Sequence, residues 1–161
     1  MRKVKVNPYQ VALVFKDGMY KRLLKEGEYW LWSNQKVIVC DFTKPFEAPV
    51  ELNILLQDAE LADMLYVVEV KDNEIVLLYK NGLLESVLAA GRYTYSKSVI
   101  QYDFVRAVID KIEITENIGK ATLQSKLVAP FVRSFTVENY EKALLFVDGT
   151  FVRVIPSGVY N

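Results

Sequence analysis

Three copies of one unit follow one another along this chain. Residues 4–29, 68–93 and 135–160 align without gaps, and the first and third windows share 10 identical residues of 26. The first and second windows share 8, as do the second and third. Self-similarity at a nearly fixed period is typical of repeat architectures, in which each unit is one small supersecondary structure. We therefore expect one small fold that is used three times.

Glycines mark the turns of this unit. Six of the seven glycines fall at two equivalent positions, which are Gly18, Gly82 and Gly149, and then Gly27, Gly91 and Gly158. The residues before the first three complete an Asp-Gly or Asn-Gly pair and are Asp17, Asn81 and Asp148. Such pairs accept the positive φ angles of a type I′ hairpin turn, so they predict three tight hairpins. The second set of glycines predicts a further turn in each unit.

An unbroken apolar run of strand length precedes each hairpin pair, at residues 11–15, 75–79 and 143–147. Such runs are typical of strands that are buried on both faces. A return strand follows the hairpin, and the chain resumes as a strand after the second glycine, so each unit predicts a small antiparallel β-meander. In the first two units a V-I-x-x-D-F pattern at residues 37–42 and 99–104, aligned at a shift of 62, predicts one more strand.

Between the units the apolar period changes to that of a helix. The pattern predicts a helix over Asn53–Leu65 with Asn53 as its cap, and a weaker one from Thr115 or Glu116 to Val128 that ends before Pro130. The predicted fold class is therefore α+β and mainly antiparallel β, with tandem small β-meander repeats joined by short helices.

The expected organisation has five segments in chain order. They are β repeat 1 at 1–50, a linking helix at 51–66, β repeat 2 at 67–112, a second linking helix at 113–130 and a truncated β repeat 3 at 131–161. The third repeat is called truncated because no V-I-x-x-D-F strand follows Tyr160. We therefore expect the chain to be a piece of a longer protein. We also expect an unpaired sheet edge near Val152–Tyr160 that favours weak self-association.

Composition removes several function classes. The chain has no histidine, so Ser-His-Asp and Cys-His nucleophile systems and histidine-ligated metals are not expected. Its 20 basic and 20 acidic residues balance without a basic cluster, which argues against nucleic acid as a partner. A single cysteine indicates a reducing, cytoplasmic setting, and no apolar stretch is long enough to predict a membrane span. We expect no catalytic residues, no cofactor and no bound metal.

The aromatic cluster Tyr29, Trp30 and Trp32 is the best candidate interaction site. Alternating aromatics pack against neighbouring strands by default, but an exposed row could bind a peptide or a carbohydrate. Both interpretations stay open at this point. Exposed tryptophans would favour a binding module, and buried ones a structural module.

The remaining polar candidates have structural explanations. Cys40 lies inside an apolar strand and is expected to be a buried structural thiol and not a redox centre. Asp41 and Asp103 recur in the V-I-x-x-D-F pattern and are expected to be turn residues and not an acid pair. Three helix carboxylates are expected to face water and not a cation, namely Asp58, Glu60 and Asp63.

The repeated unit has the form V-x-x-x-x-x-A-L-L-x-x-D-G-x-x-x-R-V-L-x-x-G-x-Y, with the closest segments at residues 70–93 and 140–149. It resembles the N-terminal region of bacterial slipins, which belong to the stomatin, prohibitin and flotillin superfamily, known as SPFH or Band 7. The resemblance implies an array of β repeats that precedes an SPFH domain, which would lie outside this chain.

Superfamily members are scaffolds that organise membrane microdomains and regulate proteases or channels. The resemblance thus implies a non-enzymatic structural or interaction module with protein partners, and self-association of the full-length protein. It implies membrane association only through parts outside this chain. The alternative is a peptide- or protein-binding module that uses a sheet edge or the strip of Tyr29, Trp30 and Trp32.

Overall fold

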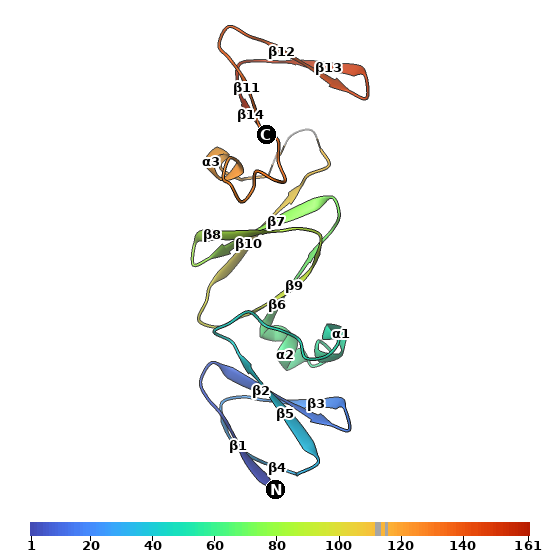
Figure 1. The fold of residues 1–161 in the computed structure, drawn as a ribbon, viewed down its shortest axis with the longest axis vertical. Coiled ribbons are helices and arrows are strands. Elements are labelled where there is room, and N and C mark those ends of the chain that lie inside the picture. The colour runs from blue at the N-terminus through green and yellow to red at the C-terminus, as the bar shows by residue number, and fades with distance from the viewer. Residues whose placement is uncertain (112–113, 115) are drawn as a thin grey trace. The chain divides into compact units, whose positions relative to one another are not determined.

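The computed structural model describes residues 1–111, 114 and 116–161 (Figure 1). Half of the chain is strand and 8% is helix, arranged as several small antiparallel sheets and hairpins with short helices. The predicted fold class is thus confirmed. Residues 113 and 115, which are two of the starts predicted for the second linker and its helix, lie outside the described residues, whereas Glu116 is described and is not helical.

The elements repeat in the order that the sequence windows suggest (Figure 1). The first repeat holds β1 (Arg2–Val6), β2 (Gln10–Lys16), β3 (Met19–Leu24), β4 (Gly27–Leu31) and β5 (Gln35–Asp41), followed by α1 (Leu52–Leu55) and α2 (Ala59–Asp63). The second holds β6 (Leu65–Val70), β7 (Glu74–Lys80), β8 (Leu83–Leu88), β9 (Gly91–Ser96) and β10 (Tyr102–Val108), followed by α3 (Lys120–Leu123). The third holds β11 (Phe135–Val137), β12 (Ala143–Val147), β13 (Thr150–Ile155) and β14 (Gly158–Tyr160).

The chain divides into two compact units. One comprises Met1–Glu69, Tyr79–Leu84 and Gly91–Asp103, and the other comprises Val70–Leu78, Glu85–Ala90 and Phe104–Asn161. The first repeat therefore lies within one unit and the third within the other, while strands of the second repeat contribute to both.

Strand pairing follows one scheme in all three repeats. The first and fourth strands of a repeat pair with each other, as β1–β4, β6–β9 and β11–β14. The second strand pairs with the third, and in the first two repeats also with the fifth, which gives the orders β3-β2-β5 and β8-β7-β10. A simple meander would place the fourth strand beside the third, so this pairing differs from the expectation. The alternation of lysine and valine over Lys3–Val6 is the signal that indicates the missed strand β1.

The Asp-Gly and Asn-Gly pairs form the tight turns between the second and third strands. Lys16 and Met19 are cross-strand partners, which leaves a two-residue loop. Asp17 and Gly18 have φ angles of 53° and 76°, and the equivalent pairs have 52° and 82°, and 51° and 79°. Two consecutive positive φ values are the signature of a type I′ turn. The register of the β2–β3 pair shifts after Val14, and that of the β12–β13 pair shifts after the equivalent Leu145. Both hairpins therefore contain the same irregularity in strand pairing.

The second glycine of each unit makes room for a tyrosine. Gly27 and Gly158 have φ angles of 149° and 154°, and a Cβ atom there would lie 3.3–3.4 Å from the ring of the tyrosine two residues later. The hydroxyl of Tyr29 donates to the carbonyl of Lys25 at 2.9 Å, and that of Tyr160 donates to the carbonyl of Pro156 at 2.7 Å. This Gly-x-Tyr turn is therefore a fixed structural part of the repeat.

Two apolar layers enclose β2 in the first repeat. On one face, Ala12 and Val14 pack against the β1–β4 sheet, where Leu31 is fully buried. On the other face, Leu13 and Phe15 pack under side chains from the segment that follows β5. Both faces of β2 are therefore buried, as its unbroken apolar sequence predicts.

The first linking helix is interrupted. The expected single helix over Asn53–Leu65 is wrong, and so is the cap at Asn53, because Glu51 caps α1 and Asp58 caps α2. The carboxylate of Asp58 accepts from the backbone N–H groups of Glu60 and Leu61, which starts a new helix at that point. In the second linker the helix expected to run to Val128 is wrong for the described residues, because α3 covers only Lys120–Leu123. Its N-cap residue Gly119 has no side chain that could accept from the first N–H groups of the helix.

The fifth strands correspond at a different register from the one predicted. β5 and β10 are both seven residues long and lie 67 residues apart, not 62. Equivalent backbone hydrogen bonds confirm this register: Phe42 N donates to Tyr9 O at 2.8 Å, and Ile109 N donates to Asn73 O at 2.9 Å. Asp103 therefore does not occupy the position of Asp41, and the shared V-I-x-x-D-F letters are not structurally equivalent.

The third repeat departs from one expectation. Its apolar strand β12 is not buried on both faces, because Leu144 and Phe146 are 60% and 55% exposed. Within the described residues β12 pairs with β13 alone and β11 with β14 alone. The unpaired edges expected at Val152–Tyr160 are therefore present on β13 and β14, and β12 has one as well.

Gly82 tests the hairpin geometry. A Gly82→Val variant should lose about 1–3 kcal/mol of unfolding free energy, because a β-branched residue resists the φ of 82° found there. No atom lies within 4 Å of the added Cβ, so the loss reports backbone strain alone. Gly82→Asn is the matched control and should retain most of the stability, since Asn tolerates positive φ. Equal urea midpoints for wild type and Gly82→Val would contradict the turn assignment.

Candidate interaction site

The outer face of the β1–β4 sheet carries the candidate aromatic site. Trp30 and Trp32 are 66% and 65% exposed, and Leu31 between them is fully buried. This is the alternation of a strand with one buried face. Tyr29 faces the other way, packs against the core and makes the Gly-x-Tyr turn. The exposed surface is therefore formed by the two tryptophans, without Tyr29.

Charged groups of both signs border the tryptophans. Lys3 is the cross-strand partner of Trp30, and its ammonium lies 2.7 Å from the carboxylate of Glu28. Arg2 donates to the carbonyl of Gln35 at 2.7 Å, which connects the start of β1 to the start of β5. A shallow depression beside Trp32 is lined by Lys16 and residues 33–35. The face thus offers two large apolar rings within a charged border, which is the composition of a protein-binding surface.

In the second repeat, the positions equivalent to Trp30 and Trp32 make hydrogen bonds to another segment of the chain. Thr94 and Ser96 stand where the first repeat has its tryptophans. The hydroxyl of Thr94 donates to the carbonyl of Phe46 at 3.2 Å, and that of Ser96, which is buried, donates to the carbonyl of Phe42 at 3.0 Å. This strand position is therefore a contact surface in the second repeat and an open surface in the first.

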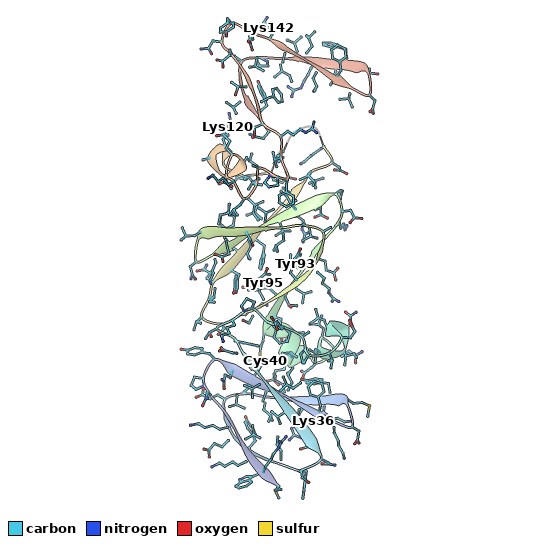
Figure 2. All side chains as sticks on the ribbon, in the orientation of Figure 1. Lys36, Cys40, Tyr93, Tyr95, Lys120 and Lys142 are labelled. Atoms are coloured by element: carbon cyan, nitrogen blue, oxygen red, sulfur yellow. The ribbon has the colours of Figure 1, made fainter. Side chains whose placement is uncertain are left out.

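The other candidates occupy structural positions. Cys40 lies on β5 and is half-buried, and its burial raises the pKa of the thiol (Figure 2). The carboxylate of Asp41 accepts from the hydroxyl and the backbone N–H of Thr43, and these bonds lower the pKa of Asp41.

Two carboxylates of the first linker, those of Asp58 and Glu60, have different partners. Asp58 caps α2 and also accepts the hydroxyl hydrogen of Tyr20 at 2.7 Å, and burial together with this bond raises the pKa of Tyr20. Glu60 pairs with Lys25. Within the part of the chain that the structure describes, no three His, Cys, Asp or Glu side chains gather as metal ligands would.

No helix in the described ranges is long and apolar enough to cross a membrane. Comparisons of the chain with protein-family models, with curated proteins and with solved structures give no match.

Intrinsic fluorescence tests the exposure of the tryptophans, since the chain has only these two. Acrylamide should quench the folded protein almost as well as it quenches free tryptophan. Replacing Trp30 by Thr and Trp32 by Ser, the residues of the second repeat, should change stability by no more than about 0.5 kcal/mol, because exposed side chains contribute little. A blue-shifted, quencher-resistant emission would show that the rings are buried.

Thiol chemistry tests the environment of Cys40, the only cysteine. Burial raises its pKa, so less thiolate forms at neutral pH and iodoacetamide should alkylate the folded chain more slowly than the unfolded chain. The folded rate should rise as the pH is raised. A folded rate equal to or above the unfolded rate would instead indicate an activated thiol.

Proposed function

We propose that this chain is a non-enzymatic structural and interaction module of a slipin-like scaffold of the SPFH or Band 7 superfamily. In this proposal it forms an array of β repeats ahead of an SPFH domain. Its partners are proteins, including further copies of the full-length protein, and it acts without a cofactor. The setting is cytoplasmic, and membrane attachment comes from parts outside this chain.

The proposed role as an interaction module is supported by a difference between two repeats. A strand position that makes contacts in the second repeat is exposed in the first. Thr94 and Ser96 bind the backbone of the segment after β5, whereas the equivalent Trp30 and Trp32 are open. In repeat proteins each unit contacts its neighbours. A unit with two exposed tryptophans at a position that makes contacts in the next repeat therefore supports a role in contacting another protein.

The chemistry of the described side chains supports a role without catalysis. Asp41 and Asp58 are engaged in a turn and a helix cap, and Cys40 has a raised pKa, which disfavours a nucleophilic thiolate. The proposed membership of a slipin-like family is supported by the resemblance of the repeated Asp-Gly and Gly-x-Tyr segments to the N-terminal region of slipins.

The coding sequence downstream of the Asn161 codon tests the proposed membership of a slipin-like family. The proposal expects it to encode an SPFH domain. A stop codon, or a domain of a catalytic class, would contradict the slipin-like assignment while leaving the repeat analysis intact.

The alternative function is capture of a peptide by the aromatic surface, and the exposure of Trp30 and Trp32 favours it. Selection of a displayed random-peptide library on the immobilised chain tests it, with the Trp30→Thr, Trp32→Ser double variant as the matched control. Enrichment of one motif by the wild type and not by the variant would support peptide capture. No enrichment on the wild type would favour the structural module.

A further inference from the structure

The chain has one Asn-Gly pair, Asn81–Gly82, and it forms the tight turn between β7 and β8 in the second repeat (Figure 1). Both residues of the pair are exposed to solvent. The first and third repeats have Asp17 and Asp148 at the position of Asn81. Of the three equivalent turns, only that of the second repeat therefore carries an amide side chain.

An asparagine that precedes a glycine brings together two groups that can react with each other. The backbone nitrogen of the glycine attacks the side-chain carbonyl carbon Cγ, and a new C–N bond closes a five-membered succinimide ring. The side-chain amide leaves as ammonia and takes the proton of the backbone N–H with it. Water then opens the ring at either carbonyl and gives aspartate or isoaspartate. Glycine favours this attack because it has no side chain to hinder the approach of its nitrogen.

The closed turn keeps the two reacting atoms of Asn81–Gly82 apart. The φ angles of 52° and 82° are those of a type I′ turn. In the left-handed conformation of its first central residue, where ψ is about +47°, the next backbone nitrogen lies roughly anti to Cβ. The ring closes only when that nitrogen and Cβ are nearly eclipsed. The Cγ of Asn81 is therefore out of reach of the Gly82 nitrogen while the turn is closed.

Two hydrogen bonds to Gln101 hold Asn81 in this closed form. The Oδ1 of Asn81 accepts from the backbone N–H of Gln101 at 3.1 Å. The backbone N–H of Asn81 donates to the carbonyl of Gln101 at 2.8 Å. These bonds connect the turn to the residue before β10, so they stabilise the conformation in which the attack cannot occur.

We propose that Asn81 is a site of spontaneous deamidation and that opening of the β7–β8 turn sets its rate. In an open turn the backbone of Asn81 is free to rotate, and the pair reacts as it does in an unfolded chain. Local segments open and close in the native state, and a slow reaction of the open form follows the population of that form. Deamidation thus records how often this turn opens. The inference goes beyond the proposed scaffold function and does not depend on it.

The two products differ in their effect on the turn. Aspartate retains it, since Asp17 and Asp148 have φ angles of 53° and 51° in the equivalent turns. A carboxylate oxygen at this position can also accept from the N–H of Gln101. Isoaspartate carries the backbone through its side-chain methylene, so the loop gains a backbone atom that a two-residue type I′ turn does not accommodate. Only isoaspartate should therefore prevent the turn from closing again.

Peptide mapping by mass spectrometry tests the proposal. The chain is incubated at one pH and temperature, once folded and once unfolded in urea, and the loss of amide is followed at each asparagine. A protein isoaspartate methyltransferase detects the isoaspartate product. In the unfolded chain Asn81 should react before any other asparagine. In the folded chain it should react at least about tenfold more slowly than in the unfolded chain, because reaction then requires local opening.

A variant of Gln101 tests the link to turn opening. Gln101→Pro removes the N–H that donates to Asn81 Oδ1 and keeps the carbonyl, so the folded variant should deamidate faster than the wild type. Gln101→Ala is the matched control, since it keeps both backbone groups, and it should react at the wild-type rate. The comparison of folded with unfolded wild type does not depend on the proline variant folding.

The Asn81→Asp variant tests the assignment of the products. It should have the urea midpoint of the wild type, whereas wild-type chains enriched in isoaspartate at this position should have a lower one. Equal deamidation rates in folded and unfolded wild type would overturn the proposal, because the turn would then not control the reaction. Earlier loss of amide at another asparagine of the unfolded chain would overturn it as well, because the site would not be selective. A folded Gln101→Pro variant that reacts no faster than Gln101→Ala would overturn the control by turn opening.

Discussion

Burial of one face of the second strand under the segment after the fifth strand is the interaction on which the first repeat depends. In the first repeat Leu13 and Phe15 are buried because the segment after β5 folds back over them. Fully burying such a side chain is worth about 1.5–3 kcal/mol, so this cover contributes a large part of the stability of a small sheet. The hydrogen bond from Tyr20 to Asp58 fastens the cover to the hairpin beneath it. The first linker is therefore part of the fold of its repeat and not a mere spacer.

Local sequence predicts those parts of the repeat that local backbone geometry determines. Asp17 and Gly18 take the φ angles that their types favour, and Gly27 makes room for Tyr29 in the same way at each recurrence. The pairing of β1 with β4 depends instead on contacts between residues far apart in the sequence, and the short alternation over Lys3–Val6 is a weak signal for it. The first linker is divided at Asp58 because the carboxylate of this residue accepts hydrogen bonds from the first N–H groups of α2 and from the hydroxyl of Tyr20.

The register of β10 shows why matching letters can mislead. The V-I-x-x-D-F pattern places Asp103 at the position of Asp41, but the backbone hydrogen bonds place β10 five residues later. Pairing with β7 decides the register, and several apolar registers satisfy the same sequence. For the candidate site, sequence identifies Trp30 and Trp32 but not their exposure. The exposure of these strand positions depends on whether another segment packs on them. The segment after β5 packs on the equivalent Thr94 and Ser96.

Native-state hydrogen exchange of the second strands tests whether an apolar cover and a fifth strand stabilise the hairpin of a repeat. The account predicts slow exchange for amides of β2 and β7, which lie between two strands under apolar cover. It predicts fast exchange along β12, where cover and fifth strand are missing, because weakly packed segments open locally at low free energy. Equal protection of β2, β7 and β12 would contradict the account, since it would show that the hairpin is stable without its cover.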